Sequence, residues 1–154
     1  MTLSEDASVE LMRQLRIAAQ LQHAWALQNW TPAAGLHPAA AALLSDLAIH
    51  GESRPSELAK RRMVDISVVS RQITQLSAAG LIDRRPAPED GRASLVSVSK
   101  DGEVLLKRWR QSHLNFVRDA LHDWTDDDVS ALTGRLQAMN EALRTAVRPA
   151  DSMS

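Results

Sequence analysis

One face of a predicted helix carries the side chains best suited to chemistry. The segment from Ile66 to Ala79 is predicted to be helical, because Asp65 can cap its start and Gly80 can end it. At about 100° per residue, Ile66, Val69, Ile73 and Leu76 form an apolar face, and the opposite face carries Ser67, Arg71, Thr74 and Gln75. Such groups reach base edges in a DNA major groove, although an ordinary solvent-facing surface is the alternative. The Arg71 guanidinium is suited to a guanine edge or to a phosphate.

The elements around this helix predict a helix-turn-helix followed by a hairpin. Residues 55–61 form a short helix, residues 62–65 a turn, and residues 66–79 the second helix of the motif. Two extended stretches follow, Leu81 to Arg85 and Ala93 to Ser99, and the intervening Asp90-Gly91 is a hairpin signal. Arg92 lies beside the expected tip, where it can enter a minor groove or form a salt bridge with Asp90.

Charge is distributed unevenly along the chain. The whole sequence has a formal charge of −1, yet residues 54–110 hold 12 basic and 7 acidic residues, a net +5 that leaves −6 for the rest. Solvated surface is the simple interpretation of such charge. Its coincidence with a helix-turn-helix and a hairpin instead indicates a part of the molecule that meets phosphate.

The flanking regions are predicted to be helical and suited to pairing with other helices. Ser4 can cap a helix that runs to about Trp30, Pro38 takes the first turn of another that stops near His50, and a further helix begins at Ser99. Thr125 with Asp128 resembles a capping box. Steps of 3 and 4 residues then connect Val129, Leu132, Leu136, Met139 and Leu143, which indicates a seam for another helix.

Composition narrows the class of protein. A chain of 154 residues with 44% hydrophobic and only 3% aromatic residues favours one mainly α domain with a small β-hairpin. The sequence has no cysteine, no signal peptide and no long apolar run, so we expect a soluble, cytoplasmic protein without a membrane span. Since it has no Gly-rich phosphate loop, Gly-x-Ser-x-Gly elbow or cysteine nucleophile, we expect no enzyme and no cofactor.

Metal binding is not expected. The five histidines, at positions 23, 37, 50, 113 and 122, include no i, i+4 pair, and there is no cysteine to join them. Asp126, Asp127 and Asp128 suggest calcium by composition alone, but they fall in the first turn of a predicted helix without an EF-hand pattern. Helix capping is the favoured interpretation of these carboxylates.

Several strings together resemble one family. They are Pro55-Ser56-Glu57-Leu58-Ala59, Val64-Asp65, Val69-Ser70-Arg71, Leu76, Gly80-Leu81-Ile82-Asp83-Arg84-Arg85 and Asp90-Gly91-Arg92. In this order and spacing they resemble the MarR family of winged helix-turn-helix regulators, with Asp90-x-Arg92 as its wing signature. The resemblance implies dimerisation helices at residues 1–35 and 101–147, a DNA-binding region at 36–100 and a tail at 148–154.

The resemblance also implies a partner and a set of contacts. We expect a homodimer that places two recognition helices in successive major grooves of a pseudo-palindromic double-stranded DNA site. The DNA-binding residues implied are Ser67, Ser70, Arg71, Thr74, Gln75, Arg84, Arg85, Arg92 and Arg62. A winged-helix protein interaction module that does not read DNA is the alternative.

Three positions depart from the family pattern. Met63 occupies the turn position where members usually have Gly, which questions the turn geometry, because glycine tolerates positive φ. Arg62 replaces an apolar residue and either contacts phosphate or lies over the core. Ile66 stands where members commonly have a polar or basic residue.

Members of the family are often repressors released from DNA by small aromatic or anionic ligands. The candidate ligand residues are Trp25, Trp30, Trp109, Arg110 and His113, because an indole beside an arginine can stack on and pair with an aromatic carboxylate. Core or dimer packing is the alternative interpretation of each tryptophan.

Overall fold

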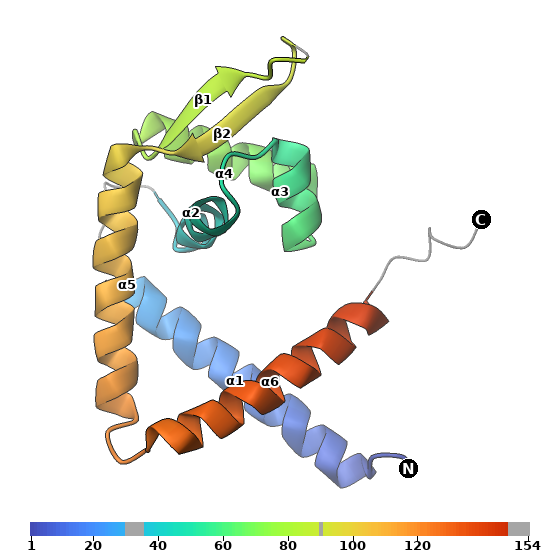
Figure 1. Cartoon of the computed structure of the whole chain (residues 1–154). Coiled ribbons are helices and arrows are strands. Elements are labelled where there is room, and N and C mark those ends of the chain that lie inside the picture. Colours follow the sequence, from blue (N-terminus) through green and yellow to red (C-terminus); the bar gives the residue numbers. More distant parts are fainter. Residues whose placement is uncertain (30–35, 90, 148–154) are drawn as a thin grey trace, which may run out of the picture. The chain divides into compact units, whose positions relative to one another are not determined.

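The computed structural model describes residues 1–29, 36–89 and 91–147, and within them the chain is mainly helical with one hairpin (Figure 1). In chain order the elements are α1 Glu5–Asn29, α2 Ala39–His50, α3 Pro55–Arg62, α4 Ile66–Ala78, β1 Ile82–Pro86, β2 Ser94–Val98, α5 Lys100–Ala120 and α6 Asp126–Ala146. This confirms the fold class. The chain divides into two compact units, Met1–His113 and Leu114–Ser154. The predicted tail at 148–154 lies outside the described residues.

Local capping signals define the helix boundaries. The Ser4 hydroxyl accepts a hydrogen bond from the Ala7 N–H at 3.2 Å, and the Asp65 carboxylate accepts one from the Ser67 N–H at 2.8 Å. Thr125 and Asp128 form a complete capping box at the start of α6. Pro38 stands at the N-cap of α2 and so precedes the first turn that we predicted for it.

The sheet extends beyond the two strands of the hairpin. β1 and β2 pair antiparallel, with Ile82 opposite Val98 and Arg84 opposite Val96. Ser53, in the loop between α2 and α3, adds a rung on the other side of β2, since it exchanges two backbone hydrogen bonds with Val96 at 3.0 and 2.9 Å. The loop therefore acts as a short third strand with β2 in the middle, which the sequence did not predict.

The core of the first unit lies beneath the helix-turn-helix. It contains aliphatic side chains from α2, α3, α4 and β2, chiefly Leu43, Leu44, Leu47, Leu58, Val69, Ile73, Leu76 and Val96. The prediction that Ile66 belongs to the apolar face of α4 is wrong, because Ile66 is 50% exposed. It is the first residue of α4, and the buried contacts begin one turn later, at Val69.

A tight joint connects the hairpin to α5. The Ser99 hydroxyl donates to the Gly80 carbonyl at 2.6 Å and accepts from the Gly102 N–H at 3.1 Å. A Cβ added at Gly102 would lie 2.2 Å from the Leu81 carbonyl oxygen, so only glycine lets the first turn of α5 approach this closely. The end of β2 is thereby fixed to the start of α5.

In the second unit, α6 leaves its apolar seam open. Val129, Leu132, Leu136 and Leu143 are all more than one-third exposed. No α6 residue is buried among the part of the chain described. Of the helices that the structure describes, none combines the length and the apolarity required of a transmembrane segment.

Candidate nucleic-acid interface

The predicted reading surface of α4 is exposed and lies opposite its buried face. Val69, Ile73 and Leu76 hold the helix against the core. This leaves five of the predicted DNA-contacting side chains at the surface, Ser67, Ser70, Arg71, Thr74 and Gln75. The Thr74 hydroxyl donates to the Ser70 carbonyl at 3.0 Å, so its oxygen remains an acceptor for an external donor. The face thus offers hydroxyl, amide and guanidinium groups on a rigid support.

The start of α4 is fixed by Asp65. Its carboxylate accepts hydrogen bonds from Ser67, which lower its pKa below the ordinary value. An ionised N-cap also interacts favourably with the positive end of the helix dipole. The N-terminal turn of the predicted recognition helix is therefore held in a single geometry.

Met63 builds the turn that usually needs glycine. It has φ 54° and ψ 41°, the left-handed conformation. Two hydrogen bonds close α3 there, from the Met63 N–H to the Lys60 carbonyl at 3.3 Å and from the Val64 N–H to the Ala59 carbonyl at 3.1 Å. Left-handed geometry costs a residue with a Cβ about 1–2 kcal/mol. The helix-turn-helix geometry is thus formed despite the departure at this position.

Arg62 is half-buried at the end of α3. Its Nε atom has no hydrogen-bond partner among the described residues, and the same holds for Oε1 of the half-buried Gln72. Burial of this part of the guanidinium fits the alternative in which Arg62 lies over the core. A phosphate contact by its outer nitrogens stays a prediction.

Ion pairs engage the basic residues at the hairpin unequally. Arg84 is exposed on β1, whereas Arg85 binds both carboxylate oxygens of Glu52 at 2.7 and 2.5 Å. The hydrogen bond from Arg85 lowers the pKa of Glu52, and the same bond raises the pKa of Arg85. Arg92 is exposed near the tip. Its predicted salt bridge with Asp90 stays a prediction, because residue 90 is not among the residues that the structure describes.

A polar cluster that the sequence did not predict supports the motif from beneath. Arg61 of α3 binds Asp46 of α2 at 3.0 and 2.6 Å and also donates to the Ser53 hydroxyl at 2.8 Å. His50 Nδ1 lies 3.5 Å from the same Asp46 oxygen. The i, i+4 spacing of Asp46 and His50 was the one local sign of this cluster, because Arg61 is 15 residues from Asp46.

Three of the predicted ligand residues meet on α1 and α5. The Trp25 ring lies 4.9 Å from the Trp109 ring and stacks on the His113 ring at 4.5 Å with an interplanar angle of 19°. Trp25 is buried, which fits the packing interpretation as well as a ligand wall. Arg110 is exposed, and Trp30 lies outside the described residues.

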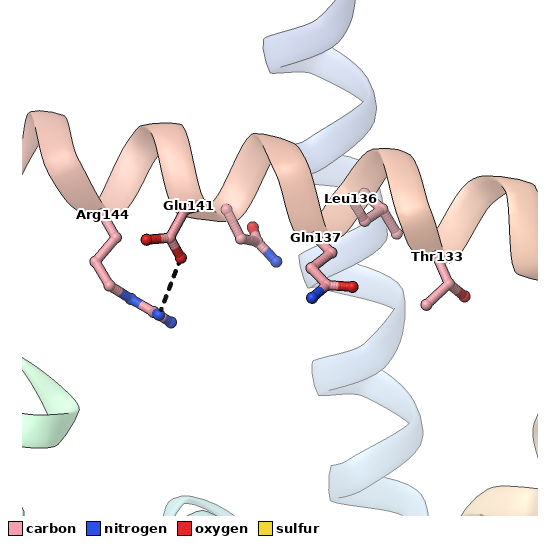
Figure 2. Close-up of a pocket in the computed structure, with 6 residues that line it drawn as sticks. Thr133, Leu136, Gln137, Glu141 and Arg144 are labelled. Carbon is pink, nitrogen blue, oxygen red and sulfur yellow. Dashed lines mark ion pairs between the residues drawn. The ribbon is translucent and has the colours of Figure 1, made fainter.

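A shallow hollow lies elsewhere, along α6 (Figure 2). Its lining is Thr133, Leu136, Gln137, Asn140, Glu141 and Arg144, with Glu141 and Arg144 paired at 3.6 Å. None of the predicted ligand residues lines it, and it overlaps the apolar seam through Leu136. In the described ranges, no group of three or more His, Asp or Glu side chains is arranged to hold a metal ion.

Known proteins match both the sequence and the fold. The MarR family model matches residues 34–93. The HTH-type transcriptional regulator YxaD of Bacillus subtilis is 39% identical over 100 residues, which cover 65% of this chain and 70% of YxaD. The chain belongs to the MarR family. The family and the fold are those of DNA-binding transcriptional regulators and not of enzymes.

Solved structures of MarR proteins share this fold. A MarR mutant from E. coli complexed with operator DNA has a TM-score of 0.73 at 21% identity, covering 90% of this chain and 99% of that one. BpsR of Bordetella bronchiseptica, whose DNA binding is regulated by 6-hydroxynicotinic acid, has a TM-score of 0.69 at 23% identity, covering 85% and 98%. The winged helix-turn-helix of the MarR family is therefore the architecture of this chain.

Proposed function

We propose that this MarR-family regulator acts as a homodimeric, sequence-specific DNA-binding repressor in the cytoplasm. The observation that carries the proposal is the exposed face of α4, which presents Ser67, Ser70, Arg71, Thr74 and Gln75. The hairpin that packs against α4 carries the exposed Arg84, Arg85 and Arg92. Arg71 is assigned to base edges, while Arg84, Arg85, Arg92 and the outer nitrogens of Arg62 are assigned to the sugar-phosphate backbone and the minor groove.

Dimerisation is proposed through the terminal regions, residues 1–35 and 101–147. The α6 seam of Val129, Leu132, Leu136, Met139 and Leu143 is apolar and follows 3,4 spacing. Four of these side chains are exposed in the single chain and Met139 is half-buried. An apolar stripe of this kind is the surface that a second helix covers. A second copy of the chain is its proposed occupant, which brings two α4 helices to one pseudo-palindromic site.

Control by a small aromatic or anionic ligand is the third part of the proposal. The ring contacts of Trp25 with Trp109 and His113 connect α1 with α5, which continues directly from β2 through the Ser99 joint. A ligand that binds there with preference for one arrangement of these helices would shift the population of DNA-competent dimers. The size of the effect equals its differential affinity for the two arrangements.

DNA reading is tested by selecting duplexes from a random library with the full chain. A pseudo-palindromic consensus with half-sites about one helical turn apart is expected. Footprinting on the DNA beside the protein's own gene then asks whether the consensus occurs there. If no sequence is enriched at moderate salt, the fold serves as a protein interaction module and the proposal fails.

The dimer is tested by sedimentation of the wild-type chain and a Leu136→Glu variant. The wild type is expected to sediment with twice the mass of one chain, and the variant is expected to shift toward monomer because a carboxylate enters the apolar seam. A matched control is Glu141→Gln on the same helix, which lies off the seam. A monomeric wild type at micromolar concentration contradicts the proposal.

Ligand control is tested by tryptophan fluorescence with 6-hydroxynicotinic acid and salicylate as probes. Saturable quenching accompanied by weaker DNA binding is expected, and Trp109→Phe is expected to reduce the quenching. Saturation that leaves DNA affinity unchanged contradicts control by these compounds.

A further inference from the structure

We propose that Glu52 and Glu89 are positioning residues that hold the hairpin, the wing of this fold, in place for specific DNA binding. They act through two ion pairs, Glu52–Arg85 and Arg54–Glu89, which we call the wing–loop ion pairs. This inference rests on the proposed DNA-binding function. It assigns to two acidic side chains a favourable role at a surface that meets phosphate.

The first step is the backbone connection between the loop and the wing. Ser53 exchanges two hydrogen bonds with Val96, in the middle of β2, and is itself buried. Side chains alternate along an extended segment, so Glu52 and Arg54 lie on the face opposite Ser53. The loop therefore presents one acidic and one basic side chain on the same face, on either side of its rung on β2.

The second step is the match of charges. Glu52 binds Arg85 of β1 at 2.7 and 2.5 Å, and Arg54 binds Glu89, in the segment after β1, at 2.7 Å. The sign reverses from one pair to the next, because the loop supplies the acid in the first and the base in the second. An arrangement of this kind favours one position of the hairpin and opposes a sideways shift, which would bring like charges together.

The third step is the anchor of the loop itself. The Ser53 hydroxyl accepts from Arg61, which is bound to Asp46. The loop is thereby fixed to both α2 and α3, which pack with α4 in one core. These contacts therefore fix the position of the wing relative to α4, the proposed reading helix.

The consequence is a lower entropic cost of binding. A two-stranded hairpin is marginally stable on its own, and a mobile wing would have to be ordered when it enters a groove. If the ion pairs order it beforehand, neutralising Glu52 or Glu89 weakens specific binding. If these carboxylates acted only as charges near phosphate, neutralising them would strengthen binding. The sign of the change in affinity therefore distinguishes a positioning role from simple repulsion of phosphate.

The experiment compares Glu52→Gln and Glu89→Gln with a matched control, Asp83→Asn. Asp83 is an exposed acid on β1 that forms no ion pair within the described part of the chain. Each full-length variant is titrated, over a series of salt concentrations, against the duplex selected by the wild type and a scrambled duplex of equal length. Thermal unfolding confirms that each variant folds.

We expect Glu52→Gln and Glu89→Gln to weaken binding to the selected duplex about two- to fivefold, and binding to scrambled DNA to stay equal or rise. Asp83→Asn should not weaken either. The single variant Glu89→Arg should lose specific affinity even though it adds a positive charge to the wing. The double variant Arg54→Glu/Glu89→Arg, which restores an ion pair with the charges exchanged, should regain most of that affinity.

Three results overturn the inference in distinguishable ways. If Glu52→Gln and Glu89→Gln behave like Asp83→Asn, the carboxylates act only as charges and the inference fails while the proposed function stands. If the wild type selects no sequence, the proposed function fails and the inference falls with it. A variant that lost selected and scrambled binding equally would indicate general damage and would also contradict a positioning role.

Discussion

Arg61 of α3 holds Asp46 of α2 through two hydrogen bonds to one carboxylate oxygen, at 3.0 and 2.6 Å. The carboxylate is only 12% exposed, and the same guanidinium reaches the hydroxyl of buried Ser53. One arginine therefore joins the two helices that support α4 and the loop that pairs with the wing. The proposed reading surface depends on a support that is itself partly charged.

Asp46→Asn is expected to destabilise the protein by about 1–3 kcal/mol, because it weakens charged hydrogen bonds and leaves half-buried Arg61 without its counter-ion. Denaturant unfolding at neutral pH measures the change. Arg13→Gln, which breaks the exposed Glu10–Arg13 pair on α1, is the control and should leave the stability nearly unaltered. Equal effects of the two substitutions would contradict a supporting role for Asp46.

Gly102→Ala is expected to destabilise the protein by about 1–3 kcal/mol, since the added methyl group would overlap the Leu81 carbonyl oxygen and Val98. The matched control is Gly134→Ala on α6, where a Cβ meets nothing within 4 Å. It should stabilise its helix by about 0.5–1 kcal/mol, because alanine has the higher helix propensity. Thermal unfolding measures both, and a neutral Gly102→Ala would show that the joint between β2 and α5 is looser than described.

The α6 cap gives stability a dependence on pH. Hydrogen bonds from the backbone and then the side chain of Thr125 hold the pKa of Asp128 below its ordinary value of 3.8. Because the folded pKa is the lower one, the contribution is complete above about pH 4 and is lost as the pH falls through the folded value. The difference in stability between wild type and Asp128→Asn should be the same at pH 7 and pH 5 and smaller at pH 3. A difference that grew in acid would reverse the assigned sign.

The sequence predicted what local rules determine. Asp65, Gly80 and the Thr125–Asp128 pair marked helix ends correctly, because capping depends on residues three or four positions apart. The ion pairs around Ser53 were missed, since their partners lie 15 to 35 residues apart. Nothing in the local sequence states which distant charge a folded loop will meet.

The error at Ile66 has a similar cause. A helical period assigns the same face to residues 66, 69, 73 and 76, but the core extends beneath only the later turns of α4. The predicted aromatic group fared better, because Trp25, Trp109 and His113 do meet. Their role in ligand binding stays a prediction.

The exposure of Ile66 suggests a contact with a thymine methyl group, since the N-terminal residues of a recognition helix approach base edges. Replacing single thymines in the selected duplex by uracil removes that methyl group. We expect one such replacement per half-site to weaken wild-type binding several-fold and to have little further effect on Ile66→Ala. Ile49→Ala, on exposed α2 surface, should keep the wild-type response. A similar response of Ile66→Ala and wild type would exclude the contact.

Arg71 and Arg92 should differ in what they contribute. Arg71→Ala is expected to cost about 1–3 kcal/mol of specific binding and to relax the choice of one base per half-site. Arg92→Ala should weaken binding while the selected consensus in the major groove stays the same. Repeating the duplex selection with each variant measures both properties. Wild-type affinity and consensus in both variants would contradict the docking arrangement.

The most direct test is a salt titration of the wild-type protein on its selected duplex and on random DNA. The account predicts a preference of about 10³-fold or more for the selected duplex at moderate salt, with log affinity falling linearly and steeply against log salt. Equal affinity for the two duplexes across the salt range would contradict the claim that the exposed face of α4 reads sequence.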